Sequence, residues 1–181
     1  MALKSTIFKA ELSITDLDRH YYAELALTLA RHPSETDERM MARLVAFALH
    51  ADEALQFTRG LSSDDEPDLW QKNLSGEIEL WIELGHPDEK RLRRACGRAR
   101  QVVVYSYQKR SGLTWWEQIK GSAGRFGNLS VRMLPENAIA ELAALAERSM
   151  RLQCMLQDGQ LWISSGERNI EVTPELLKAS S

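Results

Sequence analysis

The amino-acid sequence predicts an α/β protein with a central mixed β-sheet flanked by helices and with additional antiparallel hairpins at both termini. Strict alternation of apolar and polar residues from Ile78 to Leu84 is typical of a half-buried strand. Apolar residues three and four positions apart within residues 88–99 indicate an amphipathic helix, and the run QVVVYSY at 101–107 indicates a buried strand. A strand, a short helix and a second strand form a βαβ unit, so we expect these two strands to be parallel.

Length and composition limit the class of protein. The 181-residue chain is long enough for one hydrophobic core and short for two, so we expect a single domain over residues 1–181. A content of 44% hydrophobic and 27% charged residues excludes disordered and fibrous classes. No apolar run approaches the roughly 18 residues of a membrane-spanning helix, and residues 1–14 lack the apolar segment of a secretion signal. We therefore expect a cytoplasmic protein with no membrane partner, and reduced thiols at Cys96 and Cys154.

The elements before the central strands are a hairpin and a helix. Residues 3–14 and 20–31 alternate and are expected to pair as antiparallel strands, although the Ala, Glu and Leu content of 20–31 also suits a helix. Ser34 is the expected N-cap of a helix that extends to about Gln56. The apolar stripe of this helix consists of Met40, Met41, Leu44, Val45, Ala48 and Leu49.

The central hairpin and the elements after it follow from turn and cap signals. A turn at residues 73–76 joins a short strand after Asp68 to the strand 78–84. We expect Thr114 to cap a short helix through Ile119, and residues 121–127 to form a loop.

The last part of the sequence predicts a strand, a helix and a hairpin. Residues 129–134 read as a strand, and Pro135 is expected to start a helix. Asp158-Gly159 between two alternating runs is a strong hairpin signal, and residues 169–172 add a third strand. We expect these three strands to form a small antiparallel sheet at the C-terminus.

Carboxylates carry the chemical signal of this sequence. No glycine-rich phosphate loop, serine nucleophile elbow, HExxH or CxxC motif occurs, and the four histidines are scattered singly. A zinc centre, a Ser-His-Asp triad and an organic cofactor therefore have no sequence support. In contrast, Glu77, Glu79 and Glu83 share one face of the strand 78–84, and Asp68 lies one hairpin away.

Charge divides the middle of the chain into an acidic and a basic block. Residues 61–90 hold nine acids against two lysines, and residues 91–132 hold ten bases against one acid. Metal-assisted phosphodiester chemistry uses such an arrangement, because cations gather phosphates while carboxylates hold the metal. The alternative is that the two blocks only neutralise each other across the folded surface.

Several basic residues are candidates for contact with DNA or RNA. Arg39 and Arg43 are four apart on a helix, and Arg91, Arg94 and Arg98 are expected to point outward from the next helix. Basic side chains beside Trp115 and Trp116 could neutralise and stack on a nucleic-acid strand. The candidates that we select are Arg39, Arg94, Arg98, Lys109, Arg110 and Arg125. In the alternative interpretation the tryptophans belong to the core and the bases are solvated.

The acidic segment resembles the PD-(D/E)xK nuclease pattern through Glu66-Pro67-Asp68 and the following strand with Glu79 and Glu83. The resemblance implies that Asp68 and Glu83 hold Mg²⁺ and that Glu79 assists. It also implies a lysine two residues after the second acid, but Gly85 and Trp81 occupy those two positions. Lys72, Lys90 or Lys109 could reach the site from a neighbouring element, and Lys109 is our candidate.

Longer segments resemble the YaeQ family of bacterial proteins over nearly the full length. They are HPSETDERMMARLVAFALHA (32–51), TRGLSSDDEPDLWQKNLSGEIELWIELG (58–85), DEKRLRRACGRARQVVVYSY (88–107) and LPENAIAELAALAERSM (134–150). The resemblance implies a compact variant of the restriction-endonuclease-like fold.

Three hypotheses for the function remain open on the sequence alone. The first is a Mg²⁺-dependent nuclease in which Asp68, Glu79, Glu83 and Lys109 form the site. The second is an inactive member of the fold that binds a nucleic acid or a protein partner without cleavage, as the absent lysine would favour. In the third, the acids only pair with the arginines of the next helix.

Overall fold

The computed structural model describes residues 4–59 and 65–181, and these residues form two compact units, each built on its own mixed β-sheet. Unit 1 contains the chain up to Ala51 together with Glu136–Pro174. Unit 2 contains Asp52–Pro135 and Glu175–Ser181. The mixed α/β class is thereby confirmed. We describe the two units separately, and the expected single domain stays a prediction.

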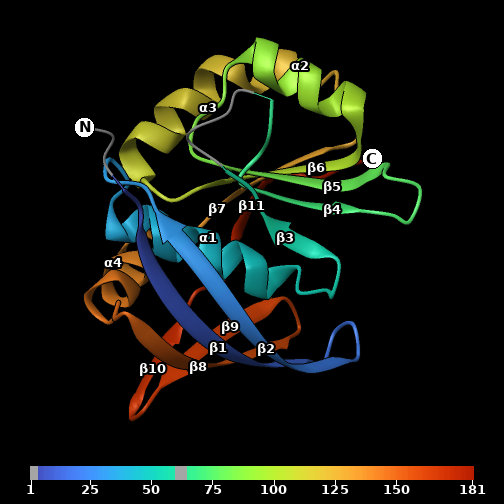
Figure 1. Ribbon diagram of the computed structural model, residues 1–181. Helices are drawn as coiled ribbons and strands as arrows, with labels where there is room; N and C mark the ends of the chain where they lie inside the picture. Colours follow the sequence, from blue (N-terminus) through green and yellow to red (C-terminus); the bar gives the residue numbers. More distant parts are fainter. Residues whose placement is uncertain (1–3, 60–64) are drawn as a thin grey trace. The chain divides into compact units, whose positions relative to one another are not determined.

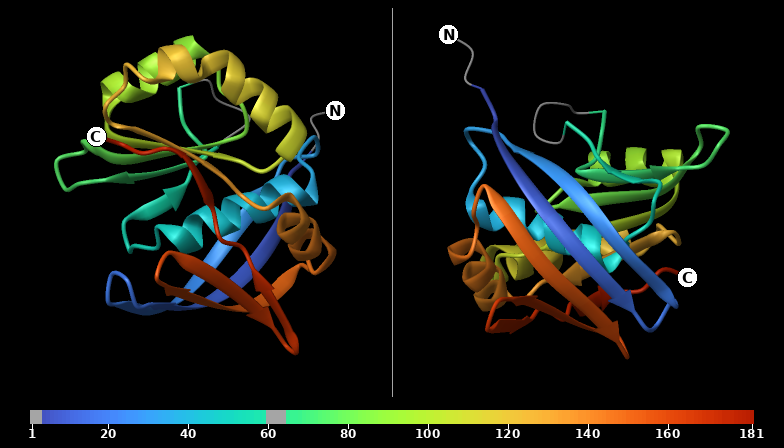
Figure 2. Two further views of the ribbon diagram at one scale, coloured as in Figure 1. Left: turned by 180° about the vertical axis from the view of Figure 1, so that it is seen from behind. Right: turned by 60° about the horizontal axis from the view of Figure 1, so that its bottom comes forward.

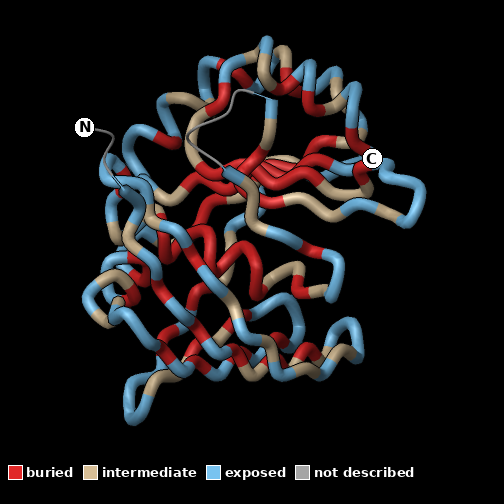
Figure 3. The backbone as a smooth tube through the Cα atoms, viewed as in Figure 1, coloured by how far each residue is buried: buried red, intermediate tan, exposed pale blue. Residues whose placement is uncertain are grey.

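Unit 1 has a five-stranded sheet in the order β10-β9-β8-β1-β2, with two helices. Its elements are β1 (Thr6–Asp16), β2 (Tyr21–Arg31), α1 (Asp37–Leu49), α4 (Glu136–Ala144), β8 (Ser149–Gln157), β9 (Gln160–Ser165) and β10 (Arg168–Glu171). The predicted antiparallel hairpin of β1 and β2 is confirmed, with Leu12 opposite Leu25. Alternate residues of β1 are buried, because one face of this strand packs in the core and the other faces solvent (Figure 3).

The predicted antiparallel arrangement of the three C-terminal strands is confirmed, and these strands belong to the larger five-stranded sheet. β8 and β9 form the predicted hairpin at Asp158-Gly159, and β10 adds to β9. However, β8 also pairs with β1 in parallel, with Leu12 opposite Leu152 (Figure 2). Alternation predicts that a segment is a strand, but it does not encode which distant strand the segment pairs with.

Helix α1 is shorter at both ends than the predicted helix from Ser34 to about Gln56. Its N-cap is Thr36, whose hydroxyl accepts the Arg39 amide at 3.1 Å, while the Ser34 hydroxyl contacts Nδ1 of His32 at 2.7 Å. The helix ends at Leu49. Asp52 then accepts the amide of Ala54 at 2.8 Å in a turn that leads into a strand, where we expected the helix to continue.

Unit 2 has a six-stranded sheet in the order β11-β7-β6-β5-β4-β3, with two helices on one face (Figure 1). Its elements are β3 (Leu55–Phe57), β4 (Leu69–Lys72), β5 (Ile78–Leu84), α2 (Glu89–Arg98), β6 (Ala99–Ser106), α3 (Lys109–Ala123), β7 (Leu129–Met133) and β11 (Glu175–Lys178). The central hairpin is antiparallel, and the βαβ unit of β5, α2 and β6 is parallel, as predicted. The edge strands β3 and β11 were not predicted.

Helix α3 begins earlier and ends later than expected. It starts after Gln108, whose side chain makes no cap hydrogen bond, and it continues to Ala123 through part of the predicted loop. The hydroxyl of Thr114 donates to the Arg110 carbonyl at 3.0 Å within the helix, so Thr114 is not a cap. At Gly112 a Cβ atom would overlap the buried Ser106 hydroxyl and would lie 2.7 Å from Cε of Met133, so a larger residue would force these side chains to move.

The core of unit 2 lies between its sheet and the helices α2 and α3. Trp81 of β5 packs there with Leu92, Ala95, Val104 and Ile119, and both Trp115 and Trp116 pack against the margin of this cluster. β5 is therefore covered on the face that carries its acids. Within residues 4–59 and 65–181, no helix is long and apolar enough to cross a membrane.

Candidate functional site

Two buried carboxylates, Asp68 and Glu83, lie next to each other on the paired strands of the central hairpin. The register Leu69 opposite Ile82 and the bond from the Asp68 amide to the Ile82 carbonyl, 3.0 Å, place Asp68 beside Glu83. The Leu84 amide donates to Oδ2 of Asp68 at 2.8 Å. Asp68 is 3% exposed and Glu83 4% exposed. The pair lies at the carboxyl end of β5, the edge of a parallel sheet where ligands are commonly bound.

Glu83 is held by one indole and one guanidinium. Its Oε1 accepts from Nε1 of Trp81 at 2.9 Å and from Nε of Arg91 at 2.8 Å. Nη2 of Arg91 also lies 2.8 Å from Oε1 of Glu83, and it donates to the backbone carbonyl of Glu66 at 2.8 Å. Arg91 therefore links β5 to the segment that leads into β4.

The surroundings of Glu83 raise the pKa of its carboxyl from 4.5 to about 7. Burial is the largest cause, because a buried carboxylate loses its hydration, and the neighbouring charge of Asp68 raises the pKa further. Arg91 and the hydrogen bonds from Trp81 and Arg91 lower it only in part. The carboxyl of Glu83 therefore changes charge near neutral pH.

Glu79 lies on the same strand face but away from this pair. Its oxygens accept from Nδ2 of Asn73 at 3.1 Å and lie 3.4 Å from Nη1 of Arg100. Glu79 and Glu83 are four positions apart, about 13 Å along the strand, and the buried Trp81 lies between them. Two of the three predicted acids thus come together, and Glu79 is the one that does not.

Alternation predicts a half-buried strand from Ile78 to Leu84, but both faces of this strand are buried at its carboxyl end. Trp81 and Glu83 are both buried there. The cause is the coverage of the face with the acids by α2 and α3, which the alternation of one strand cannot reveal.

Lys109 enters from the same edge of the sheet as the carboxylate pair. It is the first residue of α3, which begins shortly after β6 ends at Ser106, and β6 is the parallel neighbour of β5. Its side chain is exposed. Of the other two candidate lysines, Lys72 places Nζ 3.9 Å from the ring centroid of Trp70, and Lys90 is exposed on α2.

Carboxylate oxygens are ligands that hard divalent cations prefer, but this site offers only two of them. Within residues 4–59 and 65–181, no group of three or more His, Cys, Asp and Glu side chains could hold a metal ion. Mg²⁺ needs fewer than three protein ligands, because it keeps several waters and is often bound by one or two carboxylates plus substrate phosphate. Asp68 and Glu83 supply oxygen ligands of this kind, although Oε1 of Glu83 already accepts from Trp81 and Arg91.

The basic residues of α2 border the segment before Asp68. Nη1 of Arg98 donates to the Asp65 carbonyl at 2.7 Å, and its guanidinium lies 5.2 Å from the ring centroid of Trp81. Nη1 of Arg94 lies 3.6 Å from the Asp65 carboxylate. Both side chains remain exposed, so they can also reach a ligand.

The other predicted basic residues lie elsewhere in the fold. Arg110 is exposed in the first turn of α3, and Arg125 is exposed just after this helix. Arg39 belongs to unit 1, where its Nη1 donates to the buried Glu35 at 2.9 Å. The tryptophans beside the basic block pack in the protein. Trp115 donates to the Pro87 carbonyl at 2.8 Å and stacks on His86, with ring centroids 5.6 Å apart.

Arg91 is the site residue that the sequence interpretation missed. We expected it to point outward from the helix, but its side chain is only 26% exposed and contacts Glu83. The available signal was its position in the first turn of the helix that follows β5. A long side chain at that point can reach back over the strand end.

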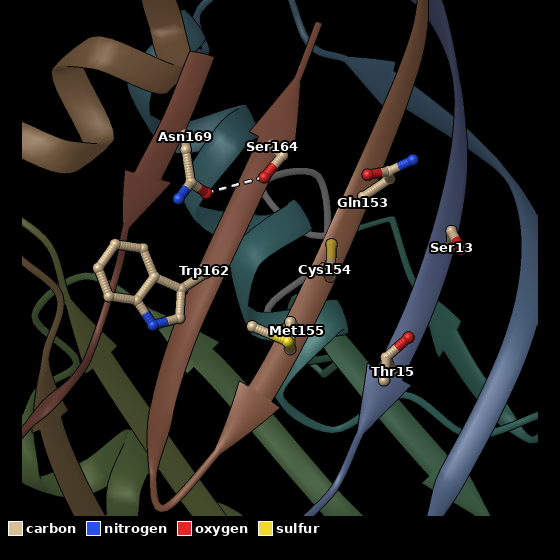
Figure 4. Close-up of a pocket in the computed structure, with 8 residues that line it drawn as sticks. All are labelled: Ser13, Thr15, Gln153, Cys154, Met155, Trp162, Ser164 and Asn169. Carbon is tan, nitrogen blue, oxygen red and sulfur yellow. Dashed lines mark hydrogen bonds between the residues drawn. The ribbon is translucent and has the colours of Figure 1, made fainter. Parts of the chain in front are cut away.

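Unit 1 carries a separate hollow of about 400 Å³ on its five-stranded sheet (Figure 4). Its lining contains no charged side chain, and the Ser164 hydroxyl contacts Oδ1 of Asn169 at 2.8 Å. The lining residues are Ser13, Thr15, Gln153, Cys154, Met155, Trp162, Ser164 and Asn169. None of the predicted site residues lies there, and the lining offers no carboxylate for a metal and no cation for a phosphate.

Together these features define an α/β protein with two mixed sheets and a buried carboxylate pair at the carboxyl end of a parallel strand. The chain belongs to the YaeQ protein family, whose sequence pattern matches residues 1–174. The family suggested by the sequence is thereby confirmed.

Relatives and solved structures agree with this assignment. The chain is 50% identical over 172 residues to the "Uncharacterized protein YaeQ" of Escherichia coli (strain K12) and, equally, to that of Salmonella typhi, with 95% of each chain covered. It resembles the crystal structure of the YaeQ protein from Xanthomonas axonopodis pv. citri, with a TM-score of 0.93, 48% identity and coverage of 97% and 99% of the two chains. The YaeQ structure from Pseudomonas syringae has a TM-score of 0.93 at 35% identity, with 97% of each chain covered.

Proposed function

We propose that this protein is a Mg²⁺-dependent phosphodiester hydrolase that acts on nucleic acid, with Asp68 and Glu83 as the metal ligands. The observation that carries the proposal is the placement of two buried carboxylates side by side at the edge of the parallel strands. The resemblance of the sequence to the restriction-endonuclease-like fold supports this proposal.

The negative charges of Asp68 and Glu83 favour a bound cation. Two adjacent carboxylates in a buried site destabilise each other when both are ionised. Burial raises the pKa of Glu83 most, and the charge of Asp68 raises it further. Removing a carboxylate from water is costly unless a cation compensates it. A divalent cation between Asp68 and Glu83 would relieve both effects, which supports a metal site over a purely structural role.

The reaction needs few groups from the chain. A bound Mg²⁺ would polarise the phosphate and lower the pKa of an attacking water. Asp68 and Glu83 would fix the position of the ion, since one is anchored by the Leu84 amide and the other by Trp81. The water oxygen forms a new bond to phosphorus and gives up a proton, while the bond to the leaving oxygen breaks and that oxygen takes up a proton.

The basic side chains beside the pair suit a polyanionic substrate. Arg94 and Arg98 are exposed on α2, next to the segment that leads to Asp68, and Lys109 opens α3 at the same sheet edge. Phosphate contacts of this kind provide affinity without sequence selection and make binding salt-dependent. DNA and RNA are both substrates to be tested.

Metal binding is the first test of the proposal. Titration of the protein with MgCl₂ or MnCl₂ should change the fluorescence of Trp81, whose indole donates to Glu83, and should release heat in a calorimeter. Asp68→Asn and Glu83→Gln should each weaken binding at least about tenfold. Glu79→Gln is the matched control on the same strand and should leave the affinity unchanged. Equal affinity in all three variants would rule out this metal site.

Cleavage is the second test. Single- and double-stranded DNA and RNA are incubated with the protein and MgCl₂ or MnCl₂, and products are separated on denaturing gels. We expect cleavage that EDTA abolishes and that Asp68→Asn reduces by about a hundredfold or more. A preparation that binds the metal but cleaves none of the four substrates would contradict the hydrolase assignment.

A second candidate function is binding of nucleic acid without cleavage. The observation that favours it is the ion pair between Glu83 and Arg91, which neutralises one of the two carboxylates without a metal. In that case labelled DNA or RNA would shift on native gels, with affinity that falls steeply with salt, and excess Mg²⁺ would produce no cleavage. Arg94→Ala and Arg98→Ala would weaken this binding.

A further inference from the structure

We infer that Arg91 replaces the absent motif lysine: it neutralises Glu83 in the metal-free protein and, once a divalent ion is bound, it holds the phosphate that is cleaved. This inference rests on the proposed function and assigns a new residue to it. It also predicts a competition between Arg91 and the metal, which can be measured whether or not the protein cleaves nucleic acid.

The first step concerns Gly85, which occupies the position of the motif lysine, two residues after Glu83. Gly85 has φ of +108°, a conformation that L side chains rarely adopt, although no atom lies within 4 Å of its Cβ position. Its amide donates to the Tyr105 carbonyl at 2.9 Å, which ties this turn to the neighbouring strand. The conformation of the turn, rather than lack of space, therefore disfavours a lysine at this position.

The second step is the placement of the Arg91 guanidinium. Nε and Nη2 each lie 2.8 Å from Oε1 of Glu83, and Nη2 also donates to the Glu66 carbonyl at 2.8 Å. The main-chain amide of Arg91 is fixed at 2.8 Å by the N-cap carboxylate of Asp88. A cation is thus held at the carboxylate pair from the helix that follows β5.

The third step is the chemistry of a guanidinium. Arginine remains charged at all relevant pH values, so it cannot serve as a general base as a lysine can. Its planar set of N–H donors suits two parallel hydrogen bonds to phosphate oxygens. Arg91 is therefore suited to orient a phosphate and to stabilise its transition-state charge, while the proton must be taken by another group.

The fourth step is the competition for Glu83. A divalent ion bound by Glu83 and the guanidinium of Arg91 both require the negative charge of the same carboxylate. Binding of the ion would weaken the contact between Arg91 and Oε1, while the Glu66 carbonyl would keep the guanidinium near the site. The guanidinium could then take up a phosphate bound to the same ion.

Metal affinity of Arg91 variants provides the first readout. Calorimetric titration with MnCl₂ is performed on the wild type, Arg91→Ala, Arg91→Lys and the control Arg93→Ala, whose guanidinium pairs with Glu89 on the exposed side of α2. We expect Arg91→Ala to bind Mn²⁺ about tenfold more tightly, since the competing cation is gone, and Arg93→Ala to match the wild type. Circular dichroism and thermal melts verify that each variant is folded.

If Arg91→Ala does not fold, the Mn²⁺ affinity is measured on Arg91→Lys instead. We expect that affinity to be closer to the wild-type value.

Cleavage provides the second readout and separates this inference from the proposed function. For an active enzyme, Arg91→Ala should lower kcat by about a hundredfold despite tighter metal binding, and Arg91→Lys should recover part of the loss. If Arg91 only held the turn in place, Arg91→Ala would misplace Glu83 and lower metal affinity and kcat together, and Arg91→Lys would recover neither. Unchanged Mn²⁺ affinity in Arg91→Ala would overturn the inference. Absence of cleavage in the wild type would overturn the proposed hydrolase, and tighter metal binding in Arg91→Ala would still support the competition.

Discussion

Two buried glutamates, Glu35 in unit 1 and Glu83 in unit 2, both contact arginine but differ in the charges around them. Glu35 faces two guanidiniums: Arg43 lies 2.6 Å from Oε1 and 3.0 Å from Oε2, and Arg39 lies 2.9 Å from Oε2. Glu83 faces one guanidinium, from Arg91, and one further carboxylate, from Asp68. The two side chains are similarly buried, at 2% and 6% exposure.

This difference separates a structural carboxylate from a candidate ligand site. An acid with two cationic partners is fully compensated within the protein, so it needs nothing from outside. An acid beside a second acid gains from an additional cation. Burial and an arginine contact are therefore not enough to identify a functional carboxylate, and the charges of all neighbours must be considered.

The largest expected effect is at Glu35. Glu35→Ala leaves Arg43, whose side chain is 6% exposed, without its carboxylate partner, and loss of one member of a buried ion pair costs about 3–5 kcal/mol. Urea unfolding followed by circular dichroism measures the change. A loss below about 1 kcal/mol would show that the Glu35 cluster is not structural and would remove the contrast with Glu83.

A smaller effect is expected at Glu83, where the ionised carboxylate destabilises the folded state instead of stabilising it. Because the pKa of Glu83 is about 7 in the folded protein and near 4.5 when unfolded, the folded state binds more protons between these values. Stability should therefore fall as the pH rises from about 4.5 to about 7, by up to about 3 kcal/mol from this group.

The variant Glu83→Gln isolates this contribution. It cannot ionise, so its free energy of unfolding should decrease less over the same pH range than that of the wild type. Urea unfolding at a series of pH values measures both curves. If the two curves ran parallel between pH 4.5 and 7, the raised pKa of Glu83 would be refuted.

The next effect concerns the turn at Gly85, which follows Glu83 at the end of β5. Gly85→Ala should destabilise the protein by about 1–2 kcal/mol, because a Cβ atom disfavours a φ of +108° even in open space. Gly85→Lys should cost a similar amount, since the strain comes from the backbone. Thermal denaturation compares the two variants. A stable Gly85→Lys protein with raised activity would show that the turn tolerates the usual lysine position.

The smallest effect is expected at Glu79, the acid outside the pair. Its partner Arg100 is 76% exposed, and such surface ion pairs contribute little. Glu79→Gln should change the free energy of unfolding by less than about 0.5 kcal/mol. Loss of metal affinity in this variant would place Glu79 in the site and contradict its separation from Glu83.

Much of the fold could be predicted from local patterns. The alternation in residues 3–14 and 20–31 predicts the first hairpin, and the apolar spacing in 88–99 with the following β-branched run predicts the βαβ unit. Pairing between distant segments could not be predicted, because alternation carries no information about the partner. For this reason the pairing of β8 with β1 and the edge strand β11 were missed.

The candidate site could be predicted only in part. The hairpin that brings Asp68 near Glu83 could be predicted, but its register could not. Lys72 pairs with Ile78 whereas Gln71 pairs with Leu80, and this irregularity moves Asp68 from opposite Ile82 to opposite Glu83. The burial of Glu83 depends on two helices that cover the strand, and the contact of Arg91 depends on the direction of a long side chain at a helix start. Both features depend on how distant elements pack, which cannot be read from the periodicity of a single strand or helix.

The parallel pairing of β1 with β8 has a consequence for biosynthesis. Lys9 pairs in register with Ser149, so about 140 residues must leave the ribosome before the first strand meets its second partner. At roughly 5–20 residues per second, the nascent hairpin keeps an open edge for on the order of ten seconds. Unit 1 therefore completes its sheet only near the end of translation, whereas most of unit 2 is made from one continuous stretch.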